Sequence, residues 1–72
     1  MKMIYKTMDK SHKNYVILSH DTEKDIYYVS YKLYGNRDRW EYQTYNHATY
    51  KFDIIHKEFT KIFPKTLLTN LK

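Results

Sequence analysis

The chain has 72 residues, a formal net charge of +5, no cysteine, one glycine and one proline. Its length predicts a single domain over residues 1–72, and the scarcity of glycine and proline argues against a disordered chain. The lack of cysteine excludes disulfides and cysteine nucleophiles. No apolar run resembles a signal peptide or approaches the roughly 20 residues of a membrane-spanning helix, so we expect a cytoplasmic protein without a membrane partner.

Two strands are predicted in the first part of the chain. Lys2–Met8 is the first, although its alternating residues mix polar and apolar side chains. Tyr15–Ser19, with the sequence YVILS, is a short apolar run rich in β-branched residues and is typical of a buried strand. The polar segments 9–14 and 20–25 that follow these strands are predicted turns.

The clearest strand is Ile26–Tyr34, because its odd positions are apolar and its even positions include Ser30 and Lys32. The segment 35–38, GNRD, predicts a hairpin turn, because Gly35 and Asn36 are able to adopt positive φ. Residues 39–45 then form a fourth strand. In these two strands the side chains expected to face the core are Tyr27, Val29, Tyr31, Leu33, Trp40, Tyr42 and Thr44.

Segment 48–63 is compatible with two patterns at its start. Alternating apolar residues from Ala48 to Ile54 would suit a strand, whereas a longer apolar stripe suits an amphipathic helix. The longer pattern favours the helix, with Asn46 as its N-cap and Pro64 ending it. The stripe contains Phe52, Ile55, Phe59, Ile62 and Phe63, and a short extra helical turn after Pro64 would be anchored by Leu67, Leu68 and Leu71.

These elements predict an α+β fold of the order β-β-β-β-α. An antiparallel meander of three to four strands would pack one face on the single C-terminal amphipathic helix. The other face of the sheet would be exposed to solvent, as is common for antiparallel sheets. The core would form where the alternating strand residues meet the apolar stripe of the helix.

The solvent-exposed face of the third and fourth strands is rich in aromatic rings and cations. Bases of single-stranded nucleic acid stack on such rings while cations hold the phosphates, and a sheet can also enter the major groove of duplex DNA. Lysines near the N-terminus would extend this basic surface if the first strand lies beside the hairpin. The residues expected to bind a nucleic acid (DNA or RNA) or another partner are Tyr28, Lys32, Tyr34, Arg37, Arg39, Gln43 and Tyr45.

A protein partner is the alternative. Tyrosine is favoured at protein–protein interfaces, so the same face would serve an inhibitor or adaptor that docks on a host protein, including one that handles nucleic acid. The sequence leaves the oligomeric state open. Abundant lysine, asparagine, isoleucine and tyrosine indicate an AT-rich coding sequence, as in low-GC bacteria, their phages and mobile elements.

Strand and hairpin residues within 26–63, including YYVSYK and a glycine-containing turn, give an element order that resembles the arm-type DNA-binding domains of tyrosine recombinases. The resemblance implies a sheet packed on a C-terminal helix and a DNA partner. The signature of that family at the start of its helix is absent from NHATYKFDII, so no site residue is transferred from the family to this chain.

No catalytic or metal motif is present, and no cofactor is expected. The acidic turn DTEKDI begins like a calcium loop, but Ile26 and Lys32 stand where such a loop needs glycine and glutamate. The histidines lack zinc-site spacing. Toxin-type ribonucleases of the RelE and ParE group use dispersed lysine, arginine, tyrosine and histidine, but here the helix comes last instead of first. We therefore expect a non-enzymatic binding module.

Overall fold

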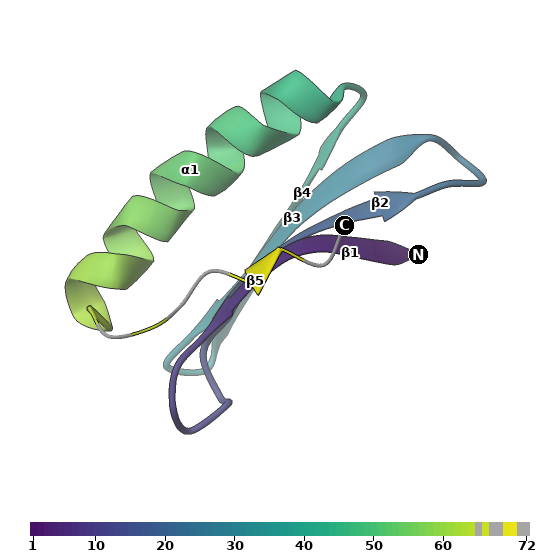
Figure 1. The fold of residues 1–72 in the computed structure, drawn as a ribbon. Coiled ribbons are helices and arrows are strands. Elements are labelled where there is room, and N and C mark those ends of the chain that lie inside the picture. Colours follow the sequence, from purple (N-terminus) through teal and green to yellow (C-terminus); the bar gives the residue numbers. More distant parts are fainter. Residues whose placement is uncertain (65, 67–68, 71–72) are drawn as a thin grey trace.

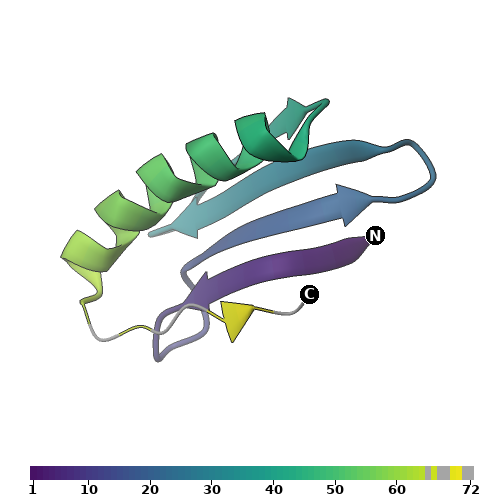
Figure 2. The same cartoon turned by 45° about the horizontal axis from the view of Figure 1, so that its top comes forward.

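The fold is an antiparallel sheet with one helix packed on one of its faces (Figure 1). The computed structural model describes residues 1–64 and 66, and the backbone of residues 69–70. Within this part of the chain the strand order is β4-β3-β2-β1-β5, so the first four strands form a meander (Figure 2). This confirms the predicted α+β arrangement. The elements are β1 (Lys2–Met8), β2 (Tyr15–Asp21), β3 (Ile26–Leu33), β4 (Asn36–Tyr42), α1 (Tyr45–Ile62) and β5 (Thr69–Asn70).

Strand β1 has the predicted bounds but contains an irregularity that the sequence pattern did not indicate. The register with β2 shifts between Met3 and Tyr5. Ile4 lies at this bulge, and its side chain is buried in the core. A bulge inserts one extra residue into a strand and redirects the side chains around it. This explains how a strand of mixed polarity contributes an apolar residue to the interior.

Strand β2 is longer than predicted, because it ends at Asp21 and not at Ser19. The antiparallel ladder with β3 continues through His20, which pairs with Tyr27, and through Asp21, which pairs with Ile26. The aromatic rings of His20 and Tyr27 also stack, with centroids 4.1 Å apart. Cross-strand pairing therefore extends the strand into a segment whose polar composition suggested a turn.

The hairpin between β3 and β4 corrects two predicted boundaries. The turn is Tyr34-Gly35, with φ of 50° and 85°, and Asn36 pairs with Leu33. Positive φ at both central residues defines a type I′ turn, whose twist matches that of the flanking strands. The bounds predicted for the turn, 35–38, and for the fourth strand, 39–45, are therefore wrong. Because the turn has only two residues, β4 starts earlier than predicted, at Asn36, and ends at Tyr42.

Helix α1 begins and ends close to the predicted positions, but with a different cap. Thr44 is the N-cap, and its side-chain oxygen accepts the backbone N–H of His47 at 3.2 Å. Asn46, the predicted N-cap, lies inside the helix, and Tyr45 is its first residue, not a strand residue. At the other end Phe63 caps the helix, and Pro64 follows. Pro64 cannot donate a backbone N–H, which suits the end of a helix.

The segment after Pro64 was predicted to form a further helical turn. Among the described residues of this segment, Thr66 donates its backbone N–H to the carbonyl of Phe63 at 3.2 Å. Thr69 and Asn70 pair with Lys6 and Tyr5 of β1 as an antiparallel strand, which the sequence did not predict. The three leucines predicted to anchor the turn, Leu67, Leu68 and Leu71, lie outside the described residues.

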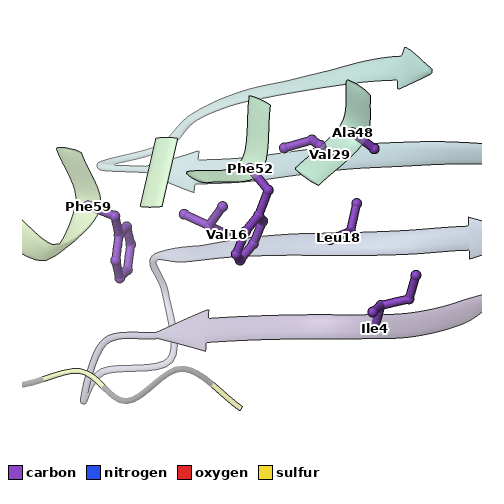
Figure 3. Packing of buried hydrophobic residues seen from close by; sticks show 7 residues of the cluster. All are labelled: Ile4, Val16, Leu18, Val29, Ala48, Phe52 and Phe59. Carbon is purple, nitrogen blue, oxygen red and sulfur yellow. The ribbon is translucent and has the colours of Figure 1, made fainter. Parts of the chain in front are cut away.

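The core lies between α1 and the centre of the sheet (Figure 3). Odd-numbered residues of β3 face the helix, as predicted, with Val29 fully buried. Trp40 and Tyr42 also pack against this cluster but remain half-buried, and Ile62 is 42% exposed. One helix covers only part of a sheet, so the aromatic residues form the rim of the core. Its fully buried members are Ile4, Val16, Leu18, Val29, Ala48, Phe52 and Phe59.

Candidate functional site

The sheet face opposite α1, here called the open face, carries the candidate site. Residues directly opposite one another on antiparallel strands lie on the same face. The register therefore places successive residues from β1 to β4 in rows across the open face. The three rows are Met8, Tyr15, Lys32 and Arg37, then Lys6, Ile17, Ser30 and Arg39, then Met3, Ser19, Tyr28 and Glu41.

Three cations gather where β3 and β4 pair. Lys32 lies directly opposite Arg37, and Arg39 is the next open-face residue along β4. We call Lys32, Arg37 and Arg39 the cationic cluster. Among the described residues, none of the three is in an ion pair. Like charges directly opposite each other destabilise a sheet, so this arrangement has an electrostatic cost that a bound anion would offset.

The guanidinium of Arg39 is held in place by an aromatic ring. Its Cζ atom lies 4.6 Å from the ring centroid of Tyr28, a cation–π contact. Tyr28 is only 5% exposed, and Ser19, opposite it on the open face, is also 5% exposed. The Arg39 guanidinium therefore covers part of a ring that has almost no exposed surface. Tyr28 therefore positions Arg39 and is not free to stack on a base.

The rings of two other predicted interface tyrosines pack toward the helix and not over the cationic cluster. Tyr34 is in the hairpin turn, where its side chain is 70% exposed and its ring centroid lies 6.0 Å from that of Phe63 at the end of α1. Tyr45 belongs to α1 and packs edge-on against Tyr27 at 5.9 Å. The prediction that Tyr45 lies on the outer face of a fourth strand is therefore wrong, because β4 has ended before it.

The environment of Tyr45 supports a structural role. Its hydroxyl oxygen lies 3.4 Å from that of Tyr5, on the helix side of the sheet. The hydrogen bond with Tyr5 and partial burial raise the pKa of Tyr45. Gln43, the remaining predicted residue, is exposed just beyond the end of β4, at the end of the sheet away from Lys32 and Arg37.

The open face contains two residues that the sequence analysis did not assign to a site. Tyr15 lies directly opposite Lys32, and Lys6 lies in the same row as Arg39. Alternation within YVILS places Tyr15 and Ile17 on one face, but it does not reveal which strands are neighbours. Since β2 lies between β1 and β3, Lys6 is separated from the cationic cluster and the basic surface is not continuous.

Charge is distributed unevenly along the strands. Lys10 and Lys13 lie in the turn after β1, at the same end of the sheet as Lys32 and Arg37. The acidic turn 21–25 lies at the opposite end. In this turn Asp21 accepts the backbone N–H groups of Glu23 and Lys24, and Asp25 lies 2.8 Å from His20. The carboxylates of Asp21 and Asp25 therefore stabilise this turn.

The half of the open face formed by β1 and β2 is more apolar than the half formed by β3 and β4. Met3 is 44% exposed, and Met8, Tyr15 and Ile17 are half-buried although no helix covers them. The open face therefore combines an apolar surface with the adjoining cationic cluster.

The residues that the structure describes contain no group of three histidine or acidic side chains placed to hold a metal ion. The helix that they form does not combine the length and the apolar character needed to cross a membrane. Comparisons with protein-family models, curated proteins and solved structures found no significant match.

Proposed function

We propose that this protein is a small non-enzymatic module that binds nucleic acid through the open face of its sheet, as a regulator or accessory protein. The observation that carries the proposal is the cationic cluster. Lys32 and Arg37 lie directly opposite each other without a described ion-pair partner. Their repulsion would be relieved by the phosphates of a nucleic acid, which supply most of its affinity for basic surfaces.

The geometry favours a duplex over a single strand. Base stacking needs exposed rings beside the cations, whereas Tyr28 is buried and Tyr15, opposite Lys32, is half-buried. The exposed ring of Tyr34 packs against Phe63 on the helix side and not over the open face. A sheet with projecting arginines suits the major groove, where a guanidinium donates two hydrogen bonds to guanine. Arg39, supported from below by Tyr28, is the residue best placed for such a contact.

A protein partner is the second candidate, and one observation favours it. The half of the open face formed by β1 and β2 is mainly apolar, with Met3, Met8 and Ile17, and its cation Lys6 lies apart from the cationic cluster. A protein with an acidic region beside an apolar one would match both halves of the face. This is the inhibitor or adaptor function, in which the chain docks on a host protein.

The test compares variants for binding to duplex DNA, single-stranded DNA and RNA at several salt concentrations. The logarithm of the binding constant falls linearly with the logarithm of the salt concentration. Lys32→Ala/Arg37→Ala should reduce the steepness of this line by about 0.9 for each duplex phosphate that the two side chains neutralise in the original chain. Lys24→Ala is the matched control, because Lys24 is an exposed cation in the turn at the other end of the sheet. It should leave the slope unchanged.

Stability separates a binding defect from a folding defect. Removing Lys32 and Arg37 removes like-charge repulsion, so the double variant should be at least as stable as the original chain. Weaker binding with undiminished stability supports the proposal. No saturable binding to any nucleic acid at low salt would contradict it. Recovery of one stoichiometric protein from nuclease-treated host lysate, abolished in a Met3→Lys/Ile17→Lys variant, would then support the protein-docking function.

A further inference from the structure

Strand β4 forms a free edge of the sheet. It pairs with β3 on one side, and no described residue pairs with its other side. In a hairpin with a two-residue turn, the residues flanking the turn, here Leu33 and Asn36, exchange backbone hydrogen bonds. The backbone groups of Asn36 therefore point to β3. Since alternate residues point in opposite directions, those of Arg37, Arg39 and Glu41 point outward and are available to another strand.

We propose that two copies of the chain pair antiparallel through β4, with the twofold axis at Trp40. Charge complementarity within the sequence RDRWEYQ, residues 37–43, favours this pairing. With Trp40 at the axis, Arg39 lies opposite Glu41 of the second copy, and Glu41 lies opposite Arg39 of the second copy. Two ion pairs, each between Arg39 of one copy and Glu41 of the other, then form on the open face, one on each side of the axis.

Neighbouring registers lack this complementarity. With the axis at Arg39, the two Arg39 side chains would lie opposite each other. With the axis at Glu41, the two Glu41 side chains would do so. Like charges directly opposite each other are destabilising. The arrangement of charges therefore selects the register centred on Trp40.

The helix side of β4 is compatible with this register. Trp40 is half-buried, stacked on Tyr31 at 5.5 Å and covered by the ammonium group of Lys51 at 4.2 Å. The remaining exposed part of its ring would meet Trp40 of the second copy, because residues at the axis lie opposite themselves. Residues opposite each other without mutual backbone hydrogen bonds have the shorter Cα separation, which brings their side chains together.

In the monomer, the side chain of Asp38 competes with pairing. The carboxylate of Asp38 accepts the outward backbone N–H of Arg39 at 2.8 Å. In the dimer this N–H donates instead to a backbone carbonyl of the second copy, so Asp38 must turn away. Capping by Asp38 protects the edge at low concentration and makes the pairing reversible.

The dimer is inferred from the fold and the charges alone. If the proposed nucleic-acid function also holds, the dimer places Lys32 and Arg37 of both copies on the same open face, related by the twofold axis. A twofold-symmetric site on a duplex would then suit it best. That consequence rests on the proposed function, whereas association of the chain in the absence of nucleic acid does not.

Sedimentation velocity over a wide concentration range tests the dimer without nucleic acid. The single charge reversals Arg39→Glu and Glu41→Arg each place like charges opposite each other twice and should raise the dissociation constant at least tenfold. The double variant Arg39→Glu/Glu41→Arg restores both ion pairs with reversed polarity and should dimerise within about threefold of the original chain. Asp38→Ala, which removes the competing cap, should dimerise more tightly.

Two further measurements fix the place and register of the contact. Trp40 is the only tryptophan, so its emission should shift to shorter wavelength as the dimer forms. With no native cysteine, the variant Arg37→Cys/Gln43→Cys should form a disulfide-linked dimer, whereas each single cysteine variant should not. A monomer at all concentrations up to about 1 mM, or a dimer unaffected by the single charge reversals, would overturn the proposal.

Discussion

Asp9 and Asn14 show how two polar side chains join turns that are distant in sequence. The carboxylate of Asp9 accepts the Ser11 hydroxyl at 2.6 Å and both the backbone and side-chain N–H groups of Asn14, each at 3.0 Å. The side-chain oxygen of Asn14 in turn accepts the backbone N–H of Tyr34 at 2.8 Å. The turn after β1 is therefore fixed to the hairpin turn between Lys32 and Arg37 of the cationic cluster.

This network predicts a loss of stability in acid. The hydrogen bonds from Ser11 and then Asn14 outweigh the effect of burial and lower the pKa of Asp9 well below its usual value of 3.8. The unfolded chain therefore takes up the proton first, so the stabilisation is fully present above about pH 5 and is lost as the pH falls below about 4. Asp9→Asn should lower the free energy of unfolding at pH 7 and flatten its dependence on pH in this window.

Denaturant unfolding between pH 7 and pH 2 measures the effect of Asp9→Asn. Asp53→Asn is the control, because Asp53 is an exposed carboxylate on α1. Equal pH dependence in the Asp9→Asn variant and in the original chain would show that Asp9 does not carry the acid sensitivity.

At the scale of elements, the β3–β4 hairpin depends on an unusual residue in its turn. Tyr34 adopts φ of 50°, a conformation that costs energy for most L-residues, and Gly35 follows at 85°. Asn-Gly is the common sequence of a type I′ turn, because asparagine tolerates this conformation better than tyrosine. The turn sets the register of β4, so its geometry decides which residues reach the open face.

Substitutions in this turn should have opposite effects. Gly35→Ala should destabilise the fold by about 1–2 kcal/mol, since a side chain disfavours the left-handed conformation. No atom lies within 4 Å of the added Cβ, so the cost comes from the backbone alone. Tyr34→Asn should stabilise the fold by up to about 1 kcal/mol, because asparagine tolerates the left-handed conformation better than tyrosine. The substitution removes an exposed ring and therefore loses only its packing on Phe63. Thermal unfolding measures both, and a stabilising Gly35→Ala would contradict the assigned turn.

At the scale of the whole molecule, stability depends on a small core. One helix contacts the sheet, and its Phe52 and Phe59 rings enter the fully buried cluster (Figure 3). A domain of this size buries only about 60% of the surface that its unfolded chain exposes. Each large core side chain therefore contributes a considerable part of the free energy of unfolding.

Phe59→Ala tests this dependence. Phe59 is 3% exposed, so its removal should cost about 3–5 kcal/mol, which approaches the total stability of a small domain. Ile62→Ala, at an exposed position on the same helix, is the comparison and should cost much less. Unfolding in denaturant followed by circular dichroism gives both values. A cost below about 1 kcal/mol for Phe59→Ala would remove Phe59 from the core.

Local sequence patterns were enough to predict the element types and the faces of the central strands. Alternation at Tyr27, Val29 and Tyr31 and the stripe through Phe52 and Phe59 depend on the periods of strand and helix, which are local properties of the chain. The α+β order followed because each amphipathic element must bury its apolar side against another. The same alternation placed Lys32 and Arg39 on the face opposite the helix, whereas Arg37 was expected in the hairpin turn and belongs to β4.

The exact boundaries, the strand neighbours and the role of each ring depended on the folded chain. Because the hairpin has a two-residue turn instead of the longer one predicted, β4 starts and ends earlier in the sequence than predicted, and Tyr45 belongs to the helix. Strand pairing separated Lys6 from the cationic cluster, and it placed the ring of Tyr28 beneath the guanidinium of Arg39. Burial and neighbourhood depend on contacts between residues far apart in sequence, which the local pattern of a single chain does not record.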